Sequence, residues 1–176
     1  MEVPPHIQRF RQLREVFVYN TTLVEWNASA ALSSIHHPKW GSVTIARSNM
    51  TDGVLPLGLQ SPEFPHTVFG VYLVETNLRS LPDDLDSKWP SCAVYIENSL
   101  LTAVPPSLMR LRPQTLSLDG NPIQAVPREL FEIGIIQYTS LSRTLLRELP
   151  QNVSFLLSYA TQLELMDTRI SFFGRG

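Results

Sequence analysis

The sequence predicts an α/β fold, a solenoid with short strands on one side and short helices, turns and loops on the other. Two observations support this prediction. An eleven-residue phrase, with apolar residues at positions 1, 4, 6 and 11 and Ser, Thr or Asn at position 9, occurs seven times. The copies follow each other at steps of 22 to 28 residues, a spacing typical of stacked repeats. The predicted repeats begin near residues 13, 40, 68, 91, 113, 136 and 160.

Each copy contains a candidate strand. The apolar residues at positions 4 and 6 are two residues apart, as a strand with one buried face requires. These pairs are Val16/Val18, Val43/Ile45, Val71/Leu73, Val94/Ile96, Leu116/Leu118, Thr139/Leu141 and Leu163/Leu165. The pair Thr139 and Leu141 departs most from the pattern.

A small polar residue at position 9 follows each strand. These residues are Thr21, Ser48, Thr76, Ser99, Asn121, Thr144 and Thr168. Their side chains can bond to backbone groups where the chain leaves the strand. We therefore expect a buried ladder of hydroxyls and amides, in which Asn121 bonds to its own repeat and to a neighbouring one.

The segments between the strands predict the outer side. Residues 27–35 are expected to form a short helix capped by Asn27, with Leu32 and Ile35 facing inward. Residues 53–65 are rich in Gly and Pro and should form an irregular loop. In the third to sixth copies an apolar residue followed by proline begins a single outer turn, as in Leu81-Pro82.

The phrase resembles the leucine-rich repeat consensus LxxLxLxxNxL, most closely in the copies at Leu13, Val68 and Leu116. The continuation N-x-L-x-x-L-P is similar to the typical subtype of about 22 to 24 residues. The resemblance covers residues 13–173. It implies a curved solenoid with a parallel β-sheet on the concave side, 3-10 turns and loops among the convex elements, and binding of other macromolecules, usually proteins.

The two ends of the repeat region differ in sequence. Residues 1–12 include Ile7 and Phe10 and are a possible N-terminal cap, with residues 13–176 as the repeat domain. The seventh copy ends in apolar residues, Phe172 among them, and shows no C-terminal cap. We therefore expect the chain to be a fragment of a larger protein.

Composition restricts the classes of function. The 176 residues are 43% hydrophobic, which is sufficient for the core of one domain. The net charge is −2 and the lysines are Lys39 and Lys88, so no basic surface for nucleic acid is expected. No apolar run approaches the roughly 18 residues of a membrane span. The N-terminus also lacks the apolar segment of a signal peptide.

Two features point to different compartments. Asn20, Asn27, Asn49 and Asn152 lie in N-x-Ser/Thr triplets and are glycosylation candidates. Against export, the family resemblance implies disulfide-bonded caps in secreted members, whereas Cys92 is the single cysteine. As written the chain is expected to be cytoplasmic, and extracellular if it is part of a secreted or membrane protein.

The sequence offers no constellation for catalysis. None of its four histidines has the spacing of a metal-ligand pair, and no phosphate-binding or nucleophile motif occurs. Cys92 is expected to be an inert thiol beside a strand. We therefore predict a protein that is not an enzyme and that uses no metal and no cofactor.

The variable strand positions project away from the core, onto the face that the resemblance makes concave. Aromatic residues gather there in the first four copies, and acidic residues gather in the third to fifth. The candidate partner-binding residues are Phe17, Tyr19, Tyr72, Glu75, Tyr95, Glu97 and Asp119. Exposed aromatic residues flanked by charge are typical of binding patches. The alternative is that strands simply favour aromatic residues.

Three functions are compatible with these observations. The first is a non-catalytic protein-protein interaction module that holds a protein partner on the concave face. The second is a ligand-binding or regulatory fragment of a larger receptor or enzyme. The third is a structural glycoprotein that acts through its sugars.

Overall fold

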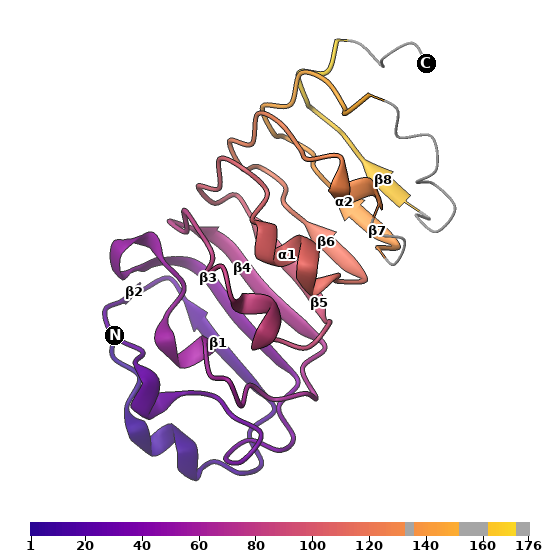
Figure 1. Ribbon diagram of the computed structural model, residues 1–176. Coiled ribbons are helices and arrows are strands. Elements are labelled where there is room, and N and C mark those ends of the chain that lie inside the picture. Colours follow the sequence, from indigo (N-terminus) through magenta and orange to yellow (C-terminus); the bar gives the residue numbers. More distant parts are fainter. Residues whose placement is uncertain (133–135, 152–161, 172–176) are drawn as a thin grey trace.

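The computed structural model describes residues 1–132, 136–151 and 162–171, and one parallel sheet runs through this part of the chain (Figure 1). Its strands lie in the order β1-β3-β4-β5-β6-β7-β8, and β2 pairs with β3 beyond the end of β1. The strands are β1 Glu15–Tyr19, β2 Thr22–Leu23, β3 Ser42–Met50, β4 Gly70–Thr76, β5 Ala93–Glu97, β6 Thr115–Ser117, β7 Tyr138–Ser140 and β8 Gln162–Glu164. Each predicted repeat contributes one strand of the main path.

The strand register aligns the predicted apolar pairs. Val43 lies between Val16 and Val71, and Leu116 lies beside Thr139 in the copy that departs most from the pattern. All seven strand pairs are parallel. A slip of one residue would turn the apolar side chains of a strand to the opposite face. The predicted strands are therefore confirmed, and their apolar face is buried except at Val16, Leu163 and Leu165, which are half-buried in the first and seventh copies.

The core lies on one face of the sheet. Strand residues such as Ile45 and Leu73 are fully buried there, and so are Leu59, Leu85 and Leu108 from the outer segments. Burial of each such side chain contributes about 1.5–3 kcal/mol. Because every repeat packs its apolar residues on those of the next, the core is continuous along the sheet.

The polar residues after the strands form the predicted buried ladder from the second copy to the sixth, whereas Thr21 and Thr168 are half-buried. The hydroxyls of Thr76 and Ser99 are 2.9 Å apart, and both side chains are buried. Asn121 is 1% exposed, and its amide donates to the carbonyl oxygens of Ile96 and Leu118 at 2.6 and 2.9 Å. The prediction that Asn121 bonds to two repeats is therefore confirmed.

One conformational feature of the repeat was not predicted. The residue immediately before each ladder position has a positive φ, between 47° and 66°. These residues are Asn20, Arg47, Glu75, Asn98, Gly120, Arg143 and Asp167. The left-handed conformation interrupts the alternation of side chains, so that the side chain at the next position, position 9, can point inward. It favours Gly and Asn, and the other residues adopt it at a cost.

Short helices cover the core face of the sheet (Figure 1). The α-helices are α1 Pro106–Leu111 and α2 Glu129–Glu132, and the 3-10 helices are η1 Pro5–Arg9, η2 Ala28–Ala30, η3 Thr51–Gly53, η4 Leu57–Leu59 and η5 Leu85–Ser87. Residues 53–65 are mostly irregular, as their Gly and Pro content predicts, and η4 interrupts them. The outer turns after the apolar-proline pairs include α1, which begins directly after Pro105.

The helix expected at residues 27–35 is shorter than predicted. Asn27 caps it, because its side-chain oxygen accepts a 3.2 Å bond from the backbone of Ser29. The helix ends at Ala30, since the backbone N–H of Leu32 donates to Gly58 of the next repeat. Leu32 is buried as predicted, but Ile35 is 63% exposed, so its predicted inward orientation is wrong.

The N-terminal segment packs beside the first repeat. The backbone N–H of Val3 donates to the carbonyl oxygen of Glu25 at 2.8 Å, and the side chain of Ile7 packs against the core. The carbonyl oxygen of Ile7 lies 3.0 Å from Nε2 of buried His37. Residues 1–12 thus lie against core side chains at the end of the sheet where β1 is the edge strand.

Candidate functional site

The sheet face opposite the core carries the predicted binding residues. We call it the open face. The side chains at phrase positions 5 and 7 form it, and Arg47 and Glu75 at position 8 join it beside Tyr19. The alternating burial of β4, in which Val71 and Leu73 are buried and Tyr72 is half-buried, separates the two faces. On the edge strand β1, Phe17 and Tyr19 are 68% and 60% exposed. The first copy therefore contributes the most exposed aromatic side chains of this face.

Tyr19, Arg47 and Glu75 form a closed cluster. Nε of Arg47 lies 3.0 Å from Glu75, and the same guanidinium donates to the hydroxyl of Tyr19 at 3.0 Å. The Glu75 carboxylate is the main cause of the raised pKa of Arg47. Glu75 is thus already neutralised within the protein, and it offers less to a partner than the sequence predicts.

Tyr72 and Tyr95 form a stacked pair. They are partners in the register of β4 and β5, and their ring centroids lie 5.0 Å apart with an interplanar angle of 16°. The Tyr72 ring extends over Gly70, where an added Cβ would lie 2.6 Å from the tyrosine hydroxyl. Burial is the main cause of the raised pKa of Tyr72, and the neighbouring Tyr95 adds to it. The two rings form a single apolar platform with hydroxyls at its margin.

Glu97 and Asp119 lie beyond this platform, and serine hydroxyls orient both. The hydroxyl of Ser117 donates to Glu97 at 2.6 Å. Asp119 accepts from the hydroxyl of Ser140 and, at 3.0 Å, from the backbone N–H of Ser142. In the described part of the chain neither carboxylate lies within ion-pair distance of a basic side chain. Their negative charges therefore remain available on the open face.

The row of carboxylates continues to β8. Glu164 accepts a 3.0 Å hydrogen bond from the hydroxyl of Tyr138, and Ser140 also lies within bonding distance of it. Burial, together with the bond to Glu164, raises the pKa of Tyr138. Glu164 extends the acidic surface by two strands past Asp119.

The structure divides the predicted site into three parts. Tyr72, Tyr95 and Glu97 come together on two neighbouring strands, and Asp119 lies just after the end of the next strand, β6. Tyr19 and Glu75 belong to the cluster with Arg47, while Phe17 stands on the edge strand opposite Thr44. This arrangement makes β4 to β6 the centre of the candidate site.

Several residues of the site were missed from the sequence. They are Arg47, Ser117, Tyr138, Ser140, Ser142 and Glu164. The diagonal positions on neighbouring strands were the available signal, since such side chains lie within reach of each other. Ser117 beside Glu97 is an example, because its β-strand partner is Tyr95, two residues before the acid.

The other sequence candidates lie outside the open-face cluster. Asn20 and Asn49 are exposed, whereas Asn27 is half-buried and donates to Glu25 at 2.7 Å. Asn152 lies outside the described residues. Cys92 is buried, and burial raises its thiol pKa to about 12, so its thiolate is scarce at neutral pH.

No protein-family model matches the chain, and no curated protein matches it. Over residues 1–132, 136–151 and 162–171, no group of three or more His, Cys, Asp or Glu side chains is placed to hold a metal ion. Within the same residues, no helix has the length and apolar character of a membrane span.

Proposed function

We propose that the chain is a leucine-rich repeat solenoid that binds an extended segment of a partner protein on its open face, without catalysing a reaction. The observation that carries this proposal is the stacked pair Tyr72 and Tyr95 beside the unpaired carboxylate of Glu97. The one-strand-per-repeat architecture and the buried ladder around Asn121 support the family assignment.

The tyrosine pair is suited to anchor an apolar side chain of the partner. Aromatic rings supply a large contact area and have few rotatable bonds, so little conformational entropy is lost when a partner covers them. Tyr72 and Tyr95 already restrict each other by stacking at 5.0 Å. The platform is therefore organised before binding, which lowers the cost of association.

The carboxylates define the charge of the partner. Glu97 is oriented by Ser117, and Asp119 by Ser140 and Ser142, so both acids are held in place with their negative charge unneutralised. A lysine or arginine of the partner would complement them. The binding segment is thus expected to carry at least one basic residue near its apolar anchor.

Strand geometry sets the spacing of these two features. Tyr95 and Glu97 are two residues apart on β5, which corresponds to about 6.6 Å along a strand. An extended partner segment that runs along β5 also repeats its side-chain direction every two residues, at about the same 6.6 Å. An apolar residue and a basic residue at positions i and i+2 of the partner therefore match the tyrosine pair and Glu97.

Site-specific photocrosslinking tests this proposal. A benzophenone amino acid replaces Val74, which lies on β4 two residues after Tyr72 and opposite Glu97 of β5. A matched variant carries it at Arg128 on the outer side. With native lysate, the Val74 variant should form adducts with peptides that carry Lys or Arg within about two to four residues of the linked position. Adducts confined to the Arg128 variant, or acidic linked peptides, would overturn the proposal.

A further inference from the structure

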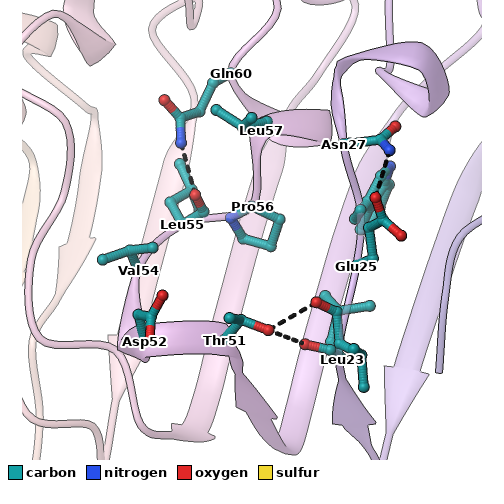
Figure 2. A pocket seen from close by; sticks show the side chains of 12 residues that line it. Leu23, Glu25, Asn27, Thr51, Asp52, Val54, Leu55, Pro56, Leu57 and Gln60 are labelled. Atoms are coloured by element: carbon teal, nitrogen blue, oxygen red, sulfur yellow. Dashed lines mark hydrogen bonds between the residues drawn. The ribbon is translucent and has the colours of Figure 1, made fainter.

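A groove lies away from the open face, between the outer segments of the first two repeats (Figure 2). It has a volume of about 340 Å³. The chain after β2, including Glu25 and Asn27, forms one side, and the segment from Val54 to Leu57 forms the other. None of the residues that line it belongs to the open-face cluster, so it is a separate surface.

The floor of the groove is apolar and rigidly packed. Leu23, Trp26 and Leu55 lie there and are at most 3% exposed. Gly58 permits this packing, because a Cβ at that position would lie 2.0 Å from the Trp26 ring. The backbone of Gly58 also donates to the carbonyl oxygen of Trp26 at 2.8 Å. The groove is therefore part of the packed fold.

Apolar side chains with large exposed fractions stand above this floor. Val24, Val54 and Leu57 are 55%, 46% and 57% exposed, and all three line the groove. Exposed apolar side chains that surround a concave surface favour the binding of another apolar group. The volume lies at the lower end of the range for ligand pockets, which fits one or two side chains better than a cofactor.

The polar groups at the rim use their donors within the protein. The amide of Gln60 donates to the carbonyl oxygen of Leu55 at 2.6 Å, and the hydroxyl of Thr51 donates to that of Val24 at 2.7 Å. The amide of Asn27 donates to Glu25 at 2.7 Å (Figure 2). What the rim offers to a ligand is therefore mainly hydrogen-bond acceptors, including the Glu25 and Asp52 carboxylates.

The two carboxylates also carry uncompensated charge. In the part of the chain that the structure describes, neither Glu25 nor Asp52 forms an ion pair with a basic side chain. The nearby cations lie outside the lining: the Met1 amine donates to the carbonyl oxygen of Thr22, and the stem of Arg79 lies beside Gly53. A ligand with a positively charged donor group fits this rim.

We propose that the groove binds a long basic side chain, arginine or lysine, presented by a partner protein. Its aliphatic stem would lie on Val24, Val54 and Leu57, and its cationic head would donate to Glu25 and Asp52. Arginine and lysine combine an apolar stem with a charged, donor-rich end, which matches the apolar floor and the acceptor-rich rim. This second docking site goes beyond binding on the open face and does not depend on it.

Peptide titration followed by methyl NMR tests the inference. The probes are the blocked peptide acetyl-Gly-Leu-Arg-Leu-Gly-amide and the same peptide with citrulline, which keeps the stem and removes the charge. The arginine peptide should shift the methyl signals of Val24, Val54 and Leu57 and bind more tightly than the citrulline peptide. Glu25→Gln and Asp52→Asn should each lower the affinity for the arginine peptide by about two- to fivefold, the range for an exposed charge pair.

Matched variants separate the groove from the open face. Val54→Asn should weaken both peptides, and Val54 is exposed enough that the fold should persist. Tyr95→Ala should leave the titration unchanged, so failure of open-face binding would not affect this result. Equal affinity for the two peptides, shifts confined to the open face, or no shift with either peptide would overturn the proposal.

Discussion

The side-chain oxygen of Asn121 accepts a 3.0 Å hydrogen bond from the backbone N–H of Leu101, one repeat earlier in the chain. Its amide nitrogen donates to Ile96 of the same earlier repeat and to Leu118 of its own. One buried side chain therefore satisfies backbone groups on two neighbouring repeats, where no strand pairing is present to do so.

Asn121→Leu should lower the free energy of unfolding by about 1 to 3 kcal/mol, because it leaves buried backbone groups without partners. Urea denaturation measures this change. The matched control is Asn49→Leu, since Asn49 is exposed on β3 and should cost less than about 0.5 kcal/mol. Equal costs for the two substitutions would contradict the role assigned to the buried amide.

Arg143→Gly should stabilise the protein. Arg143 has a φ of 56°, in the left-handed region. A residue with a side chain costs about 1 to 2 kcal/mol in this conformation, and glycine avoids that cost. Part of the gain is offset, because glycine has more conformational freedom to lose when the chain folds. We expect a net gain of up to about 1 kcal/mol in thermal or urea unfolding.

The control for this prediction is Arg147→Gly. Arg147 is also exposed, and it is not among the residues with positive φ. The same substitution should therefore lower stability at this position. Destabilisation by glycine at both positions would argue against the left-handed conformation at Arg143.

The stability of the protein should fall as the pH drops below neutrality, and His37 should cause part of this fall. Its Nε2 donates to Ile7 and its Nδ1 accepts from the backbone of Ser33 at 3.4 Å, so the neutral ring suits both partners. The groups packed around it are the Trp40 ring and His36. Burial is the main cause of its lowered pKa, and proximity to His36 adds to it.

The direction of the effect follows from proton linkage. Between the unfolded pKa of 6.5 and the lower folded pKa of His37, the unfolded chain binds more protons, so acid favours unfolding. One such group changes the free energy of unfolding by at most about 1.4 kcal/mol per pH unit.

Melting temperatures measured from pH 8 to pH 5 should fall less for His37→Asn than for the native chain. The control is His66→Asn at an exposed site, which should keep the native slope. Identical slopes in all three proteins would contradict this role for His37.

The regular features of the repeat could be predicted from the sequence because they depend on local patterns. Alternating apolar residues located each strand on the main path of the sheet, including the one with Thr139, whereas β2 was not predicted. The repeated spacing located the buried amide of Asn121. The side-by-side placement of Tyr72 and Tyr95 could also be predicted, because both occupy the same position in adjacent repeats.

The remaining features depend on contacts between repeats that a pattern does not specify. The ion pair of Arg47 with Glu75 joins long side chains near the ends of strands β3 and β4, and their rotamers decide whether it forms. Ser140 occupies a variable strand position, which was expected to project away from the core, yet it is fully buried and bonds to Asp119 and Glu164. The premature end of the helix after Ala30 depends on the bond from Leu32 to Gly58 in the next repeat.

The most direct test of the central proposal is the affinity and association rate of open-face variants for the partner protein identified by crosslinking, measured by surface plasmon resonance. Tyr72→Ala and Tyr95→Ala should each weaken binding by about 1 to 3 kcal/mol, and Glu97→Lys should mainly slow association and reduce its salt sensitivity. The controls Asp83→Ala and Arg128→Ala, on the outer side, should leave affinity unchanged. Loss of binding in these controls, with full binding in both tyrosine variants, would contradict the proposal that the partner binds the open face.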